Sequence, residues 1–254
     1  MHFAGSIISS ESVTYPLKYY SNNTTASQSL IECCVNSDVE AFIFSSTAAV
    51  YGNPDKIPVA ETAPTIPITP YGWSMLMTEW MLCDVSSVNR MRYAVLRYFN
   101  VAGADIDGRS GQVGPNSSHL IRVACELATE RRAEMSIFGT DYDTPDGTCI
   151  RDFIHVSDLA TAHVSTLHHL LENRKNLILN CGYGHGFSVR EVLNVVEELV
   201  KRSLAINAGA RRDGDATELI SDSSLIRDVL DWQPHFNNLE IIVKTALDWE
   251  ARYI

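Results

Sequence analysis

The sequence predicts an α/β fold, in which a doubly wound parallel sheet is followed by a smaller C-terminal α/β lobe. Short apolar runs alternate with amphipathic helical patterns along the chain, and strands that alternate with helices form a parallel sheet covered on both faces. The chain has 254 residues and is 45% hydrophobic, which is enough for one large domain or a domain with a subdomain.

Apolar runs rich in β-favouring residues are expected to be strands. The clearest is 41–45, where Phe42, Ile43 and Phe44 precede three hydroxyl residues. The other expected strands are the end of one at 1–4, then 91–98, 135–138, 149–155 and 177–180.

Helical periodicity and start signals predict the helices. Ser188 and Glu191 form a capping box at the start of a helix that runs to about residue 201. The other expected helices are 22–35, 71–88 (with Leu76, Trp80, Cys83 and Val85 facing inward), 118–130, one opened by Ser157 or Asp158, 223–230 and 239–253.

Composition excludes several classes of function. The net charge of -11 disfavours nucleic acid as a partner. No apolar run approaches the length of a membrane span, and the first residues lack the pattern of a signal peptide. The six cysteines form no CxxC pair, so we expect reduced thiols and a cytoplasmic location. The eight histidines lack metal-ligand spacing, so we expect no metal site.

Two hydroxyl side chains frame the candidate active site. Thr47 closes the strand pattern at 41–45, and Tyr71 follows Pro70 at the start of the next helix. The carboxyl ends of parallel strands are where α/β sheets bind ligands, so we expect Thr47 and Tyr71 to converge there.

A dinucleotide domain should begin with a strand, a glycine-rich turn and a helix, and this sequence has no such unit. The glycines at 182, 184 and 186 follow a strand pattern late in the chain, where a turn on the substrate side is the better interpretation. The chain is therefore expected to begin inside a larger fold, after its phosphate-binding half.

A set of motifs then resembles a known family. The motifs are HFAG at 2–5, ESV at 11–13, YYSNN at 19–23, FIFSSTAAVYG at 42–52, PYG at 70–72, LRYFN at 96–100, DGTCIRDFIHV at 146–156, GARRDGD at 209–215 and DW at 231–232. Together they resemble the UDP-glucose 4-epimerases of the extended short-chain dehydrogenase/reductase family, without the glycine-rich N-terminal part.

The resemblance implies a Rossmann-type sheet and NAD as cofactor. Residues 1–101 would be the remainder of the NAD-binding domain. Residues 102–254 would mainly form the lobe that binds the UDP-sugar, with some segments returning to the sheet. Tyr71 would be the general base that removes the C4 hydroxyl proton of the sugar, and Thr47 would bond the same oxygen. The reaction would interconvert UDP-glucose and UDP-galactose through a 4-keto intermediate.

The resemblance also assigns binding positions. The cofactor positions are Phe3, Ala4, Gly5, Asn22, Thr47, Tyr71, Met75 and Phe99. The substrate positions are Asn100, His119, Leu120, Ser136, Ile137, Phe138, Arg151, Arg212 and Asp215. Arginines suit the diphosphate, because a guanidinium can contact phosphate oxygens with two donors.

The sequence departs from the family pattern at the lysine of Tyr-x-x-x-Lys, where it has Met75. A nearby cation lowers the pKa of a phenol by about 1–3 units, and methionine has no charge. Trp73 stands where some members have a second lysine, Arg122 where proline is frequent, and Ile7 where some have lysine. The missing glycine-rich loop and Met75 together predict impaired activity, and the departures at Arg122 and Ile7 are weaker.

Three interpretations remain open at this stage. The chain is an epimerase of this type, a non-catalytic homologue that at most binds a UDP-sugar or a partner, or an epimerase for another UDP-sugar (a pentose or a uronate). Ala48 and Ala49 disfavour a 4,6-dehydratase, which carries an acidic pair there. A homodimer would use the helices after Asn22 and Tyr71, with Cys33, Cys34, Trp80 and Leu82 as candidates for the interface or the core.

Overall fold

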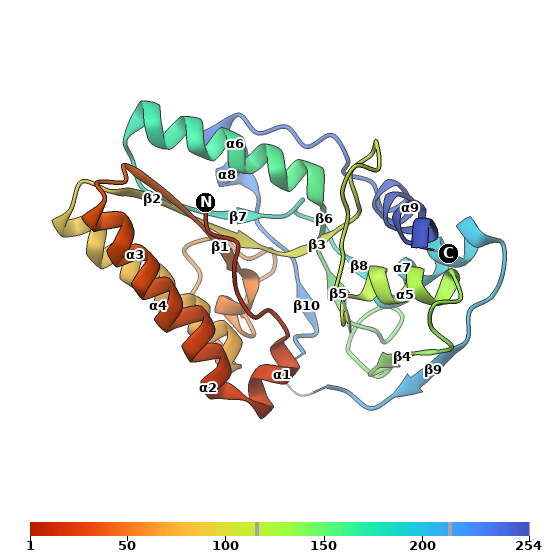
Figure 1. Ribbon diagram of the computed structural model, residues 1–254. Coiled ribbons are helices and arrows are strands. Elements are labelled where there is room, and N and C mark those ends of the chain that lie inside the picture. Colours follow the sequence, from red (N-terminus) through yellow and green to blue (C-terminus); the bar gives the residue numbers. More distant parts are fainter. Residues whose placement is uncertain (115–116, 213–214, 254) are drawn as a thin grey trace. The chain divides into compact units, whose positions relative to one another are not determined.

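The computed structural model describes residues 1–114, 117–212 and 215–253. The chain forms two compact units, each built from three segments (Figure 1). Unit 1 consists of Met1–Tyr98, Thr161–Cys181 and Asp222–Trp232, and unit 2 consists of Phe99–Ala160, Gly182–Ser221 and Gln233–Ile254.

Unit 1 contains a parallel sheet with the strand order β1-β2-β7. The strands are β1 (Ala41–Thr47), β2 (Arg92–Tyr98) and β7 (Leu177–Cys181). Thr47 pairs with Tyr98, and Tyr98 pairs with Cys181, so the three carboxyl ends are level. At the N-terminus, the strand expected at 1–4 is reduced to one parallel bridge between His2 and Phe44.

Helices cover both faces of this sheet. In Figure 1, α3 (Ala26–Asn36) and α4 (Pro70–Val88) lie on one side, and α6 (Val156–Asn173) lies on the other. The remaining helical elements of unit 1 are α1 (Ser9–Thr14), α2 (Pro16–Tyr19), the π-helix η1 (Tyr20–Thr25), the 3-10 helix η2 (Ala48–Tyr51) and α8 (Ser224–Leu230). The sequence interpretation did not include α1 or α2.

The predicted inner face of α4 is partly wrong. Leu76 is buried as expected, but Trp80 is 50% exposed and Cys83 is also exposed. The buried face includes Glu79 and Leu82 instead. The prediction followed apolar residues, whereas Glu79 is drawn inward by a buried partner on β2, described below.

Unit 2 is built from short strand pairs and three longer helices. The parallel pairs are β3 (Asn100–Ala102) with β6 (Phe153–His155) and β4 (Met135–Phe138) with β9 (Ile206–Gly209). A third sheet places β5 (Ile150–Arg151) between β10 (Glu218–Leu219) and β8 (Phe187–Ser188). The helices are α5 (Leu120–Ala128), α7 (Val189–Val200) and α9 (Leu239–Glu250), and α9 continues into the 3-10 helix η3 (Ala251–Tyr253).

The single strand expected at 149–155 is instead two strands separated at Asp152. The buried carboxylate of Asp152 accepts hydrogen bonds from the backbone N–H groups of Tyr183 (2.9 Å) and Ser221 (3.2 Å) and from the Ser221 hydroxyl (2.6 Å). A buried carboxylate needs such donors, and supplying them lets the chain pass from one strand pair to another. This carboxylate also fixes the glycine-rich turn that starts at Gly182.

The capping box is confirmed. The Ser188 hydroxyl accepts from the Glu191 N–H at 3.0 Å, and the Glu191 carboxylate accepts from the Ser188 N–H at 2.7 Å. All six cysteines are free. Within the described ranges, no cluster of histidine, cysteine or acidic residues could hold a metal ion, and no helix has both the length and the apolar character of a membrane span.

Candidate active site

Thr47 and Tyr71 meet at the carboxyl end of β1. Thr47 ends the strand and caps η2, because its hydroxyl accepts from the Ala49 N–H at 3.1 Å. Thr69 caps α4 in the same way, accepting from the Gly72 N–H at 3.3 Å. A Cβ on Gly72 would lie 2.7 Å from the Ala49 carbonyl oxygen. Glycine therefore lets the start of α4 approach η2, which brings the Tyr71 phenol beside Thr47.

The surroundings of Tyr71 do not lower the pKa of its phenol toward the value that a general base needs. Burial raises the pKa of Tyr71 above its ordinary value, and the hydrogen bond with Thr47 acts in the opposite direction. Met75, one turn along α4, is only 7% exposed and has no charge. Among the described residues, no cation acts on the pKa of Tyr71.

A buried polar cluster lies below this pair, and the sequence interpretation missed it. The Arg97 guanidinium on β2 bonds the Glu79 carboxylate on α4 at 2.6 Å and donates to the Tyr51 hydroxyl at 2.9 Å. The Glu79 carboxylate also accepts from the Ser46 hydroxyl. Ser46 precedes Thr47 on β1, and Glu79 lies two turns after Tyr71 on α4. The cluster therefore joins α4 to β1 and positions Thr47 and Tyr71 relative to each other.

The cofactor positions of unit 1 lie along the N-terminal segment and at the end of β1. Phe3 is 62% exposed, with its ring 5.0 Å from the His163 ring, and Ala4, Gly5 and Asn22 are exposed. These positions fit NAD in part. Exposed backbone at Gly5 and the hydroxyl pair suit a cofactor, but Met75 offers neither the charge nor the donor expected there. Phe99 belongs to unit 2, where it is buried.

The substrate positions of unit 2 form three groups. Asn100, His119 and Leu120 line one cavity, together with Gln112 and Trp249, which the sequence did not single out. The second group lies on β4, where the Phe138 ring has the Arg212 guanidinium 3.6 Å from its centroid. Its neighbour Ser136 is partly exposed and Ile137 is buried. The third group is Arg151 with Asp215, which are 3.9 Å apart. The part of the GARRDGD motif at 213–214 lies outside the described residues.

Comparison with known proteins agrees with this geometry. Residues 1–182 match the model of the NAD dependent epimerase/dehydratase family. A UDP-glucose 4-epimerase of Azospirillum brasilense is 53% identical over 250 residues, which cover 98% of this chain and 72% of that protein.

Solved structures give the same result. The UDP-glucose 4-epimerase of Brucella ovis in complex with NAD has a TM-score of 0.95 at 42% identity, over 98% of this chain and 77% of that one. The UDP-Glc/GlcNAc 4-epimerase of Campylobacter jejuni has a TM-score of 0.83 at 50% identity, over 99% of this chain and 76% of that one.

The chain therefore belongs to the NAD dependent epimerase/dehydratase family. Its relatives within that family are UDP-glucose 4-epimerases, which confirms the resemblance drawn from the motifs. The predicted α/β fold with a parallel sheet is confirmed as well. The expected cofactor, NAD, is the one for which the family is named and the one bound in the Brucella ovis structure.

Proposed function

We propose that this chain has the active site of a UDP-glucose 4-epimerase and that Met75 weakens its catalysis. The observation that carries the proposal is the approach of Tyr71 to Thr47 at the carboxyl end of β1, with a buried, uncharged residue one turn later. The reaction class is isomerisation at C4 of a UDP-hexose, between UDP-glucose and UDP-galactose.

The two hydroxyl groups divide the proton chemistry between them. Tyr71 takes the proton of the C4 hydroxyl while that carbon becomes a ketone, and it returns the proton when the ketone is reduced on its other face. Thr47 bonds the same oxygen and orients it. Bound NAD supplies the acceptor, and later the donor, of the C4 hydride. A phenol does this work well only when its pKa approaches the working pH.

Unit 2 would supply the UDP-sugar contacts. Arg151 and Arg212 would bond the diphosphate, and the Phe138 ring offers an apolar face for the uridine. Asn100 and His119, which line one cavity, would contact the sugar nucleotide. The choice of sugar lies between a hexose, a pentose and a uronate. One solved relative is named a UDP-Glc/GlcNAc 4-epimerase and another holds formylated UDP-arabinopyranose, which supports a broad choice.

Replacing Met75 by lysine tests the catalytic proposal. A cation at this place should lower the pKa of Tyr71 by about 1–3 units, which raises the ionised fraction at pH 7 by about tenfold or more. We therefore expect Met75→Lys to raise the conversion of UDP-galactose to UDP-glucose, measured with NAD added, by at least about tenfold.

Two matched variants control this experiment. Met75→Leu keeps the volume without the charge and should leave the rate unchanged, and Tyr71→Phe in the Met75→Lys background should abolish turnover. A Met75→Lys chain no faster than the original would contradict the assigned role of Met75.

Met75 also favours a second candidate function, binding of a UDP-sugar without turnover. Calorimetry with UDP distinguishes the two: heat of binding together with no turnover, even in Met75→Lys, would favour the binding function. No heat with UDP would exclude both.

We also propose that α3 and α4 form a homodimer interface. Trp80 is 50% exposed and Leu30 is 38% exposed on these helices, and Cys33 is exposed near Leu30 in sequence. Leu82 is fully buried and belongs to the core instead. Trp80→Glu should convert a dimer to a monomer in light scattering, and an unchanged mass would contradict this interface.

A further inference from the structure

Two helices of unit 2 hold the segment 111–114, which leads toward α5. The Trp249 indole N–H on α9 donates to the Gln112 carbonyl oxygen at 3.1 Å. The Trp249 ring also packs so closely on Gly111 that a Cβ there would lie 2.4 Å from it. From α5, the Arg122 guanidinium donates to the Gly114 carbonyl oxygen at 2.6 Å. The segment is therefore fixed at three of its four residues.

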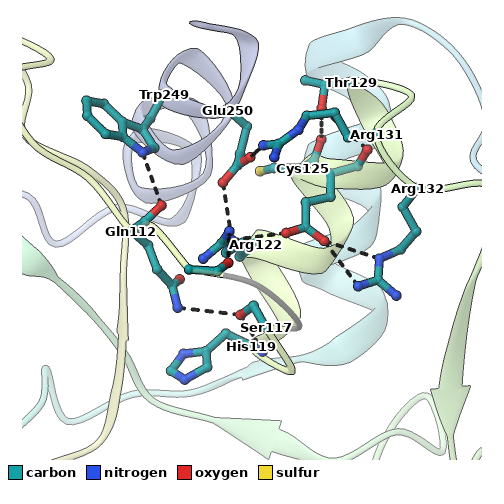
Figure 2. Close-up of polar contacts among 12 residues, drawn as sticks. Gln112, Ser117, His119, Arg122, Cys125, Thr129, Arg131, Arg132, Trp249 and Glu250 are labelled. Atoms are coloured by element: carbon teal, nitrogen blue, oxygen red, sulfur yellow. Dashed lines mark hydrogen bonds and ion pairs between the residues drawn. The ribbon is translucent and has the colours of Figure 1, made fainter. Parts of the chain in front are cut away.

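His119 is connected to the same segment. The Gln112 side chain donates to the Ser117 hydroxyl at 3.5 Å, and this hydroxyl accepts from the His119 N–H at 3.3 Å (Figure 2). Gln112 and His119 both line a cavity of about 560 Å³ between strand β3 and the start of α6. The position of segment 111–114 therefore decides where these two polar side chains lie in the cavity wall.

Arg122 belongs to a cluster that we call the arginine cluster: Arg122, Arg131, Arg132, Glu126 and Glu250. The Arg122 Nε lies 3.1 Å from Glu126 and 3.3 Å from Glu250. Glu250 also pairs with Arg131, and Glu126 also pairs with Arg132 at 3.1 Å (Figure 2). Three cations share two carboxylates, so the cluster retains positive charge three residues from His119.

We propose that Arg122 is a positioning residue of the substrate cavity, which fixes segment 111–114 against α9 and holds a positive charge near His119. Gln112 and His119 then present neutral hydrogen-bonding groups to a nucleotide sugar. This inference rests on the proposed function only for the identity of that ligand.

The electrostatics of the cavity support the second part of the proposal. Burial lowers the pKa of His119, and the positive charge of Arg122 lowers it further. Two other charged groups that line the cavity with His119, Asp105 and Arg109, pair with each other at 2.7 Å. Glu250 faces the neighbouring part of the cavity and is paired with Arg122 and Arg131.

Two variants of Arg122 separate its charge from its geometry. Arg122→Gln removes the charge and the guanidinium fork, whereas Arg122→Lys keeps the charge and loses the fork. The matched control is Arg202→Gln. The Arg202 guanidinium donates to the Ala128 carbonyl oxygen at 2.7 Å, at the opposite end of α5 from His119.

The first readout is the NMR pH titration of the His119 ring in the ligand-free chain, assigned with His119→Gln. We expect Arg122→Gln to raise the pKa of His119 toward the ordinary value of about 6.5. Arg122→Lys and Arg202→Gln should leave the pKa low. This readout does not depend on the proposed ligand.

The second readout is calorimetry with UDP at pH 8 in the presence of NAD, where His119 is neutral in every variant. We expect Arg122→Gln to weaken UDP binding by about tenfold, as for the loss of a charge-assisted hydrogen bond. Arg122→Lys should weaken it by less, and Arg202→Gln should not change it.

The outcomes distinguish the two proposals. An unchanged His119 titration in Arg122→Gln, or an equal loss of UDP affinity in Arg202→Gln, would overturn the role given to Arg122. Absence of UDP binding in the unmodified chain would overturn the proposed function, while the titration still reports on Arg122. If Arg122→Gln does not fold, Arg122→Lys decides: a low His119 pKa with weakened UDP binding supports the proposal, and unchanged UDP binding overturns it.

Discussion

Each unit of the molecule contains an ion cluster beside a candidate functional surface, and the two clusters balance their charge differently. In unit 1, Arg97 is the one cation of its cluster and faces Glu79, and both side chains are almost fully buried. In unit 2, the arginine cluster distributes three cations over two carboxylates. In unit 1 the Glu79 carboxylate is paired with one arginine. In the arginine cluster each carboxylate is paired with two arginines, so it keeps one when the other is removed.

This difference bears on function as well as on stability. The cluster in unit 1 is neutral, so it holds Thr47 and Tyr71 in place without lending charge to the phenol. The cluster in unit 2 is positive and acts on the pKa of His119. Different residues therefore position a reactive group and shift its pKa. Tyr71 has the positioning cluster, but Met75 supplies no charge that would lower the pKa of the phenol.

The largest expected effect is that of Arg97→Met. It leaves the Glu79 carboxylate buried without its cation, which should cost about 3–5 kcal/mol in the free energy of unfolding. Urea unfolding measures this cost. Replacing Glu79 by leucine in the same chain should recover much of the loss, because a buried pair can be exchanged for apolar groups at little cost. A loss below about 1 kcal/mol for Arg97→Met would contradict the single-pair description.

Arg122→Gln should be less damaging, at about 1–2 kcal/mol, because Glu250 keeps Arg131 and Glu126 keeps Arg132. The same urea experiment measures it, with Arg202→Gln as the control, because Arg202 bonds the opposite end of α5. If Arg122→Gln cost as much as Arg97→Met, the sharing of carboxylates would give no protection, and the comparison between the two clusters would fail.

The sequence was sufficient for the features that are encoded locally. The strand at β1 and the capping box at Ser188 follow from residues close together in the chain, and the approach of Tyr71 to Thr47 follows from the rule that ligands bind at the carboxyl ends of parallel strands. The ion clusters do not, since Arg97 and Glu79 are separated by 18 residues and Arg131 and Glu250 by 119. Such partners become neighbours only through the sheet and helix packing, and the break at Asp152 was missed for the same reason.

The smallest expected effect concerns His155, a buried histidine of unit 2. The Ser157 N–H donates to His155 Nδ1 at 3.1 Å, so Nδ1 carries no proton and Nε2–H donates to the Thr245 hydroxyl at 3.1 Å. Burial lowers the pKa of His155, although Asp158 and Asp105 act in the opposite direction. As the pH falls below about 6.5, the unfolded chain takes up this proton before the folded chain does.

The stability due to neutral His155 should therefore be complete above about pH 6.5 and decline as the pH falls toward the folded pKa, by at most about 1.4 kcal/mol per pH unit. Urea unfolding at pH 7.5 and 5.5 should show a smaller difference for His155→Gln than for the unmodified chain. His168 is exposed on α6, so His168→Gln should keep the full difference. An equal pH dependence in all three chains would show that His155 does not bind its proton differently in the folded and unfolded states.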